Sequence, residues 1–193
     1  MRERVGRLLP ARRGHFRFES GHHGERWLEL ERLCLDPKPV QDLAACMAKR
    51  LEPRRIEVVC GPLVEGAFVA LMVASDLGVP FTYAERVEGV ATDALYPMAY
   101  RLPIPLRDVA RGRRVAIVND VVNAGSAVRA TWADLEGCGA RPVAVGALAI
   151  LGDWASGFAA EKGLALEALA AFPSALWTPG ECPLCARGVP LES

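Results

Sequence analysis

One stretch in the middle of the chain, residues 114–127, restricts the possible folds more than any other. Four apolar residues at 115–118 predict a buried strand, which the polar residues Asn119 and Asp120 are expected to end. A short turn containing Gly125 then leads into a helix, whose buried face would carry Val128, Trp132 and Leu135. Such a turn offers backbone N–H groups and a helix N-terminus to a phosphate, and Asp120 would accept hydrogen bonds from the sugar that carries it.

The rest of the chain alternates strand and helix patterns around this unit. Strands are expected at 56–60, 81–84, 100–103 and 142–151, and helices at 37–51, 67–77 and from 152 onward. Asp36 and Pro37 mark one helix start, and Gly78 marks a helix end. The alternation predicts an α/β fold with a mostly parallel sheet and helices on both faces. Two short strands joined by a glycine-rich turn are expected before it, within 14–30.

Composition excludes several classes of protein. The chain has 193 residues, 51% of them apolar and 24% charged, which predicts one globular domain. The formal net charge is zero, so the composition gives no support to nucleic-acid or anionic-membrane binding. No apolar run approaches the length of about 18 residues that suggests a membrane span. Six cysteines in mostly apolar contexts favour free thiols and a cytoplasmic location.

Several segments together resemble a known enzyme family. The string at 114–127 resembles the 5-phosphoribosyl-diphosphate (PRPP) motif of phosphoribosyltransferases: an apolar strand, two acidic residues, a linker and a small-residue turn with hydroxyls. Residues 60–67 resemble the pyrophosphate loop of orotate phosphoribosyltransferases. Gly14-His15-Phe16, Ser20-Gly21, Trp27 and 35–37 resemble their N-terminal hood, and 177–191 resembles a tail found in some members. The resemblance covers nearly the whole chain in one order.

The resemblance implies a type I phosphoribosyltransferase fold in a single domain, 1–193. Residues 1–35 would form the hood region and 177–193 a cysteine-containing tail. The implied reaction moves ribose 5-phosphate from PRPP to a nucleobase, orotate or a related base, and releases pyrophosphate. Mg²⁺ would bridge pyrophosphate oxygens and ribose hydroxyls. The expected partners are PRPP, a nucleobase and a second copy of the chain in a homodimer.

The family's site residues carry over to three short segments. The turn that would bind the 5-phosphate comprises Asn123, Ala124, Gly125, Ser126 and Ala127, preceded by Asn119, Asp120, Val121 and Val122 in the PRPP-binding segment. Asp120, with Asn119, would hold the ribose hydroxyls at the catalytic centre. Leu63, Val64, Glu65 and Gly66 would bind pyrophosphate. Two structural alternatives stay open: Asp120 as a cap of the turn, and Ser126 as the helix N-cap.

Departures from the family pattern suggest an alternative function. Asn119 replaces an acidic residue, Asn123 replaces a threonine, and Glu65 brings a negative charge to the pyrophosphate loop. The family's lysine-rich mobile loop corresponds here to 85–96, which holds no lysine or histidine, so Arg86 and Arg101 are the candidate cations. The alternative is a catalytically weakened protein that binds PRPP or a nucleotide and acts as a regulator.

The acceptor base is the least determined feature. Orotate enzymes place an arginine after the strand that matches 143–151, where it pairs with the carboxylate of the base. This chain reads Gly152-Asp153-Trp154 at that point. The Trp154 ring is able to stack on a base, but nothing beside it would neutralise a carboxylate.

The tail contains a pair of cysteines, Cys182 and Cys185, at the spacing of a zinc knuckle. A closed structural zinc site needs four ligands, so these two are only weak candidates. Cys34, His22 and His23 would complete a site if the fold brought them near, or a dimer would pair two tails. Otherwise the tail packs with two free thiols or a redox-labile pair.

Overall fold

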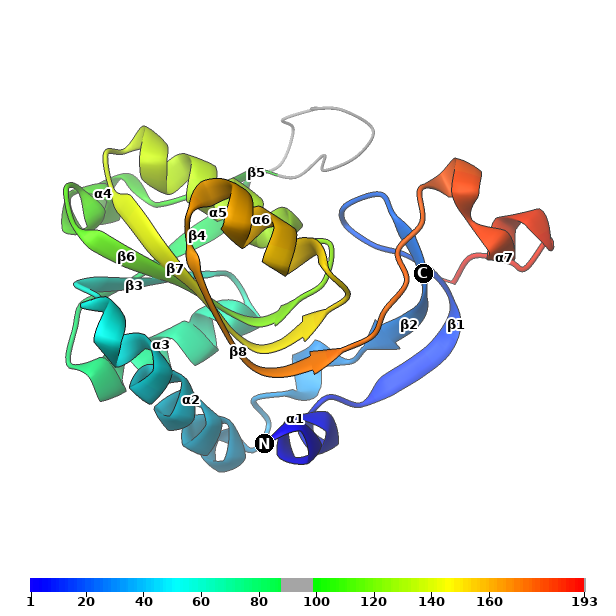
Figure 1. The fold of residues 1–193 in the computed structure, drawn as a ribbon, viewed down its shortest axis with the longest axis horizontal. Coiled ribbons are helices and arrows are strands. Elements are labelled where there is room, and N and C mark those ends of the chain that lie inside the picture. The colour runs from blue at the N-terminus through cyan, green and yellow to red at the C-terminus, as the bar shows by residue number, and fades with distance from the viewer. Residues whose placement is uncertain (88–98, 193) are drawn as a thin grey trace.

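A computed structural model describes residues 1–87 and 99–192. Its centre is a six-stranded sheet in the order β5-β4-β3-β6-β7-β8 (Figure 1). The strands are β3 (Val58–Pro62), β4 (Phe81–Val87), β5 (Ala99–Arg101), β6 (Arg114–Val122), β7 (Arg141–Leu151) and β8 (Ala165–Phe172). All neighbours are parallel except β4 and β5. The buried residues of β3, β6 and β7 form near-continuous apolar runs, as a sheet covered on both faces requires.

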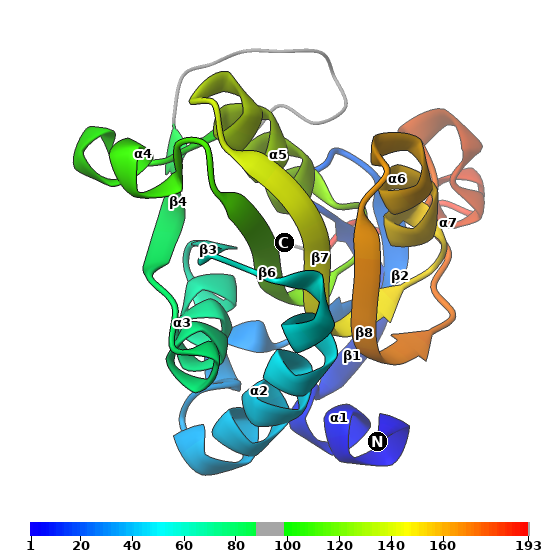
Figure 2. The same ribbon diagram turned by 60° about the vertical axis from the view of Figure 1, so that its left-hand side comes forward.

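Helices cover both faces of the sheet and enclose two cores (Figures 1 and 2). On one face lie α1 (Arg2–Leu8), α2 (Pro37–Leu51) and α3 (Glu65–Leu77), whose apolar side chains pack with Val59, Val118 and Leu148 of the sheet. On the other lie α5 (Ser126–Gly137) and α6 (Trp154–Lys162), which pack with Ile117 and Val145. A further helix, α4 (Ile104–Ala110), precedes β6. The predicted α/β class is confirmed.

The hood is an antiparallel pair of strands beside the core, β1 (Ala11–Arg17) and β2 (His23–Leu28). The chain returns to it at the C-terminus, where the short helix α7 (Pro183–Ala186) lies against β1 and β2 in both ribbon views (Figures 1 and 2). Backbone hydrogen bonds join tail and hood: His23 and Trp177 exchange two N–H···O bonds, of 2.8 and 3.0 Å, and the Glu192 N–H donates to the His15 carbonyl at 2.7 Å. Opposite ends of the sequence therefore form one substructure.

Several local predictions hold, one is wrong, and two elements were not predicted. Asp36 caps α2 by accepting from the Lys38 N–H, and Gly78 ends α3 at a φ of 66°. Asn119 and Asp120 do not end the central strand, because Val121 and Val122 continue the ladder with β7 and the strand ends only at Val122. The structure also adds α4 and β8, which the periodicity alone did not predict.

Across residues 1–87 and 99–192, every helix falls short of the length and hydropathy that crossing a bilayer would require.

Candidate functional site

The carboxyl ends of the adjacent parallel strands β3 and β6 open into one cavity of about 640 Å³. In a parallel α/β sheet, ligands bind at this edge because the loops and helix N-termini that follow the strands converge there. The turn after β6 and the loop after β3 line the cavity together. The predicted residues among its walls are Leu63, Val64, Glu65, Gly66, Asn119, Asp120, Val121, Val122, Asn123, Ala124, Gly125, Ser126 and Ala127. Two segments separated by more than 50 residues in sequence thus share one pocket.

The turn between β6 and α5 depends on Gly125. Its φ of 74° lies in the left-handed region, and a Cβ there would come within 1.8 Å of the Trp154 ring. Trp154 in turn stacks on Phe158 at a centroid separation of 4.8 Å. Because Gly125 is the N-cap of α5, Ser126 is the first helical residue and its capping alternative is wrong. The hydroxyl and the first N–H groups of the helix are left for another partner.

Asp120 is the most perturbed acid of the pocket. It is only 4% exposed, and this burial, with a smaller contribution from the negative charge of Glu65, raises its pKa to about 7. A backbone hydrogen bond from Val121 acts in the opposite direction and favours the ionised form. A carboxyl group in this environment changes charge near neutral pH, so ligand binding is able to select its ionisation state.

Two asparagines beside Asp120 have different surroundings. The Asn119 side chain donates to the Val121 carbonyl at 2.8 Å, while its Oδ1 lies where a Cβ on Gly66 would be 1.9 Å away. Asn119 therefore connects the two halves of the pocket. The Oδ1 atom of Asn123 is buried and accepts no hydrogen bond from any residue within 1–87 or 99–192. A buried acceptor without a partner costs free energy unless a ligand or solvent supplies the donor.

Glu65 opens α3, where its charge complements the helix dipole. It is half-buried and lines the pocket, so the structure places in the pocket the carboxylate that was expected to disfavour a departing pyrophosphate. Gly61 and Gly66 allow the tight path of this loop, because a Cβ on Gly61 would lie 2.6 Å from Ala70.

The hood supplies the wall that the motifs did not predict. Phe18, Glu19, Arg26 and Trp27 also line the cavity, and the Phe18 and Trp27 rings are stacked with centroids 6.2 Å apart. Alternation of aromatic and charged residues in 16–27 is the only sequence signal for this role. An arginine and two aromatic rings on one wall suit a planar, polar heterocycle.

Arg86 and Arg101 occupy different positions. Arg86, on β4, lines the cavity and donates to Glu19 at 3.1 Å, which joins the core to the hood across the pocket. Arg101 is exposed on β5 and is not among the lining residues. The remainder of the expected mobile loop, 88–98, lies outside the described residues.

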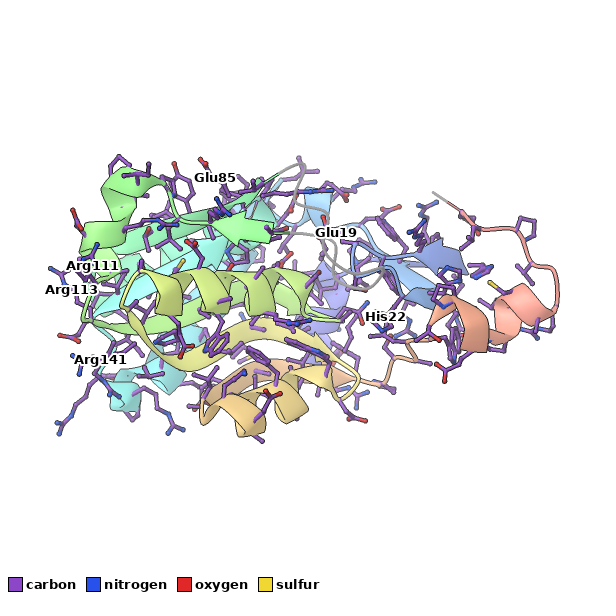
Figure 3. All side chains as sticks on the ribbon, turned by 90° about the horizontal axis from the view of Figure 1, so that it is seen from above. Glu19, His22, Glu85, Arg111, Arg113 and Arg141 are labelled. Atoms are coloured by element: carbon purple, nitrogen blue, oxygen red, sulfur yellow. The ribbon has the colours of Figure 1, made fainter. Side chains whose placement is uncertain are left out.

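Other residues lie away from the cavity. Trp154, expected beside the base, covers the back of the phosphate turn and does not line the pocket. Arg111, Arg113 and Arg141 are grouped at the end of the sheet far from His22 and the hood, as Figure 3 shows. These three arginines therefore do not contact a ligand in the pocket.

The two cysteines of the tail are brought together with two histidines, of which only His23 was among the three further ligands named from the sequence. Cys182 and Cys185 lie beside His15 and His23, whereas Cys34 is elsewhere and His22 faces Ser20. His15 was missed because its position in a strand of the hood gave no sign of its distance from the tail.

Known proteins resemble the chain in both sequence and fold, although no family model matches it. An orotate phosphoribosyltransferase of Desulforamulus reducens is 32% identical over 92% of this chain and 85% of the relative. One of Thermotoga maritima is 31% identical over 98% and 92% of the two chains. The crystal structure of an adenine phosphoribosyltransferase from Thermoanaerobacter pseudethanolicus superposes with a TM-score of 0.68 at 19% identity, covering 88% of this chain and 99% of that one.

These similarities extend over most of the chain. The two sequence relatives match 92% and 98% of the chain, and the structural relative has a similar fold. The chain belongs to the orotate phosphoribosyltransferase family of PRPP-dependent enzymes.

Proposed function

We propose that this protein transfers the 5-phosphoribosyl group of PRPP to a ring nitrogen of orotate or a related nucleobase and releases pyrophosphate. The observation that carries the proposal is the shared cavity: the phosphate turn after β6 and the pyrophosphate loop after β3 line the same 640 Å³ space. That volume lies within the range of about 300 to 1,000 Å³ that is usual for small-molecule sites. The family membership supports the same reaction.

In this proposal the turn 123–127 binds the 5-phosphate. The first N–H groups of α5 have no carbonyl of their own helix to bond, and its dipole favours an anion there. Gly125 brings the backbone close, and the Ser126 hydroxyl adds a donor. Within residues 1–87 and 99–192 nothing donates to Asn123 Oδ1, so this oxygen stays available to a bound cation or to water.

Asp120 then holds the ribose. As a carboxylate it accepts hydrogen bonds from the two ribose hydroxyls, which fixes the sugar while the anomeric carbon gains positive charge in an oxocarbenium-like transition state. Its pKa of about 7 means that part of the free protein carries a protonated Asp120 at neutral pH. If PRPP binds only to protein with an ionised Asp120, binding therefore releases a proton from the fraction in which Asp120 is protonated.

The pocket residues also fit Mg²⁺. Asp120 and Glu65 are two oxygen donors whose charges repel each other, and Asn123 adds an unpaired carbonyl oxygen. Mg²⁺ is usually bound by one or two carboxylates together with substrate phosphates, so these residues would hold it against PRPP. When bound, the ion neutralises charge on the leaving pyrophosphate. The same ion would also offset the repulsion between the Glu65 carboxylate and pyrophosphate.

The hood wall is the proposed site of the acceptor base. Phe18 and Trp27 present apolar surface to a planar ring, and the guanidinium of Arg26 would neutralise a carboxylate on it. Orotate carries such a carboxylate, which adenine lacks. Arg26 would thus replace the arginine that orotate enzymes place after the strand matching β7, where this chain has none.

We also propose a cytoplasmic homodimer. Val64, Phe68 and Leu71 expose 55%, 44% and 51% of their surface along one side of α3 and the loop before it. Such a patch on a family member is suited to a second copy of the chain. Light scattering of the purified protein tests this, and a monomer at micromolar concentration would contradict it.

The test of the main proposal is pyrophosphate release from PRPP and Mg²⁺ with a panel of bases. Orotate is expected to be the best acceptor, and Arg26→Gln is expected to reduce the preference for it. Asp120→Ala should abolish PRPP binding in calorimetry, whereas the matched surface variant Asp108→Ala should bind as before. Unchanged affinity of Asp120→Ala would contradict the assignment of the pocket.

The alternative function, a regulatory protein that binds PRPP or a nucleotide, is favoured by one observation. The Glu65 charge faces the same space as Asp120 and would oppose a pyrophosphate that is not fully neutralised. Tight PRPP binding without turnover on any base would select this alternative. In that case Glu65→Gly should restore measurable turnover.

A further inference from the structure

Four potential metal ligands meet where the C-terminal tail crosses the hood. His15 lies on β1, His23 begins β2, Cys182 is the N-cap of the short helix α7, and Cys185 lies within that helix. Their ligand atoms all lie within 4.8 Å of one another. Figure 1 shows the corresponding segments side by side at the edge of the molecule, away from the central sheet. None of the four residues lines that pocket.

Four of the six separations between the ligand atoms are close to those of a tetrahedral site. His15 Nε2 lies 3.4 Å from Cys182 Sγ, 3.7 Å from Cys185 Sγ and 3.1 Å from His23 Nδ1. His23 Nδ1 lies 3.2 Å from Cys185 Sγ. With Zn–N bonds near 2.0 Å and Zn–S bonds near 2.3 Å, neighbouring ligand atoms of a tetrahedral site are about 3.3 to 3.8 Å apart. Little movement would be needed to admit an ion between them.

The orientation of His15 gives an independent sign of a metal site. Its Nδ1 lies 2.7 Å from the Val189 carbonyl, which can only accept a hydrogen bond, so Nδ1 carries the proton. The lone pair is then on Nε2, the nitrogen that faces the two thiols and His23. Histidines that bind metals characteristically donate their other N–H to a carbonyl or carboxylate. The tail thus supplies the two thiols and also the Val189 carbonyl that orients the His15 ring.

Burial and donor type identify the metal. His15, His23 and Cys182 are 1%, 4% and 2% exposed, and only Cys185 reaches solvent. Two sulfur and two nitrogen donors suit Zn²⁺ and do not suit Mg²⁺ or Ca²⁺, which prefer oxygen. Four protein ligands leave no open position for a substrate, as is usual in structural sites. We propose that His15, His23, Cys182 and Cys185 bind one structural Zn²⁺ that fastens the C-terminal tail to the hood.

Such a site would stabilise a part of the molecule with little core of its own. The hood is a two-stranded sheet, and a sheet of that size is at best marginally stable alone. A metal closing the connection between residues 15 and 185 holds its strands in place. Since Phe18, Glu19, Arg26 and Trp27 of the hood form one wall of the pocket, the ion would also preserve that wall.

The first experiment is elemental analysis of the full-length protein purified under reducing conditions without an affinity tag that binds metal. About one zinc per chain is expected. Less than about 0.1 zinc per chain, together with no binding of Zn²⁺ by the reduced, metal-free protein at micromolar concentration, would overturn the proposal. So would a Cys182–Cys185 disulfide as the main form under those conditions.

Variants test the ligand set. Cys185→Ser changes the one exposed ligand and should therefore disturb folding least, while weakening Zn²⁺ affinity at least about 100-fold, beyond the 10- to 100-fold typical of changes to supporting residues. The matched controls are Cys34→Ser and His22→Ala, a thiol and an adjacent histidine outside the cluster, which should retain one zinc. Full zinc content in Cys185→Ser would contradict the assignment.

Spectroscopy on the unmodified protein avoids any dependence on variants that fold poorly. X-ray absorption at the zinc edge should show two sulfur and two nitrogen neighbours. Replacement by Co²⁺ should give the intense visible absorption of a tetrahedral thiolate site, lost on adding a chelator. Oxygen-only coordination would show an adventitious ion and overturn the proposal. Activity is not needed for either readout, so the outcome is separate from that of the proposed transferase.

Discussion

The pocket and the hood–tail junction are assembled in different ways. At the phosphate turn, the consecutive residues 119–127 line the pocket. At the hood–tail junction, residues from the two ends of the chain come together: His15, His23, Cys182 and Cys185. In the turn, local chemistry decides much of the structure: Gly125 adopts a positive φ and a helix begins directly after it. At the junction, distant segments must already be in place before the side chains meet. The difference implies that changes in the turn act on the ligand directly, while changes at the junction act through the position of the hood.

The largest expected effect concerns the charge of Asp120 in the turn. Its pKa of about 7 in the folded protein lies well above the 3.8 of a free side chain, because burial disfavours the carboxylate. The folded protein therefore binds more protons than the unfolded chain between pH 4 and 7, and its stability falls as pH rises through that window. The full difference corresponds to about 4 kcal/mol.

Asp120→Asn isolates this contribution because the amide imitates the protonated acid. Relative to the natural protein, the variant should be more stable at pH 8 by on the order of 4 kcal/mol and nearly equal at pH 4. Denaturant unfolding of both proteins across this range, without ligand, measures the difference. If the free energy of unfolding depended on pH in the same way in both proteins, the pKa of Asp120 would not be raised in the folded state.

A second large effect is expected for Gly125→Ala in the same turn. A left-handed φ costs a non-glycine residue about 1 to 2 kcal/mol, and the new Cβ must also displace Trp154. The free energy of unfolding should fall by about 3 kcal/mol, with loss of PRPP binding. Gly137→Ala, at the end of the same helix with no atom near its Cβ, is the control and should change stability by less than about 1 kcal/mol.

Combining Gly125→Ala with Trp154→Leu distinguishes the two causes. Removing the large ring should recover the part of the loss that comes from the clash and leave the part that comes from the φ angle. No recovery in the double variant would show that the contact with Trp154 is not what restricts the turn.

These two regions also explain what the sequence was able to predict. The strand, turn and helix around 114–127 follow from apolar periodicity and Gly125, so the position of the pocket was predictable from one segment. The end of the strand was not, since Val121 and Val122 pair with a strand 28 residues away. Phe18, Arg26 and Trp27 were missed as pocket residues, and His15 as a ligand, because tertiary packing alone brings them there.

A smaller effect is expected on the hood side of the pocket. Phe18→Leu removes the ring stacked on Trp27 and should cost about 1 kcal/mol of stability. If the hood binds the base, KM for the base should rise about 5-fold, and KM for PRPP should change less than about 2-fold. Phe81→Leu removes a ring with the same 6.2 Å centroid separation from a neighbour, Tyr83, but outside the pocket. An equal rise in KM for the base in both variants would contradict the assignment of the base to the hood side of the pocket.

The smallest effect is expected for Arg86, which joins β4 to the hood by its ion pair with Glu19. Both side chains are about half exposed, at 52% and 44%, so Arg86→Gln should change the free energy of unfolding by less than about 1 kcal/mol. If the guanidinium also faces pyrophosphate, KM for PRPP should rise about 3-fold at low ionic strength and less at high salt, where charges are screened. Arg101→Gln, exposed on the neighbouring strand and outside the pocket, should leave KM unchanged. A similar rise in both variants would indicate general attraction of the anion by the surface, whereas a rise in Arg86→Gln alone would assign the missing cation of the pyrophosphate site to β4.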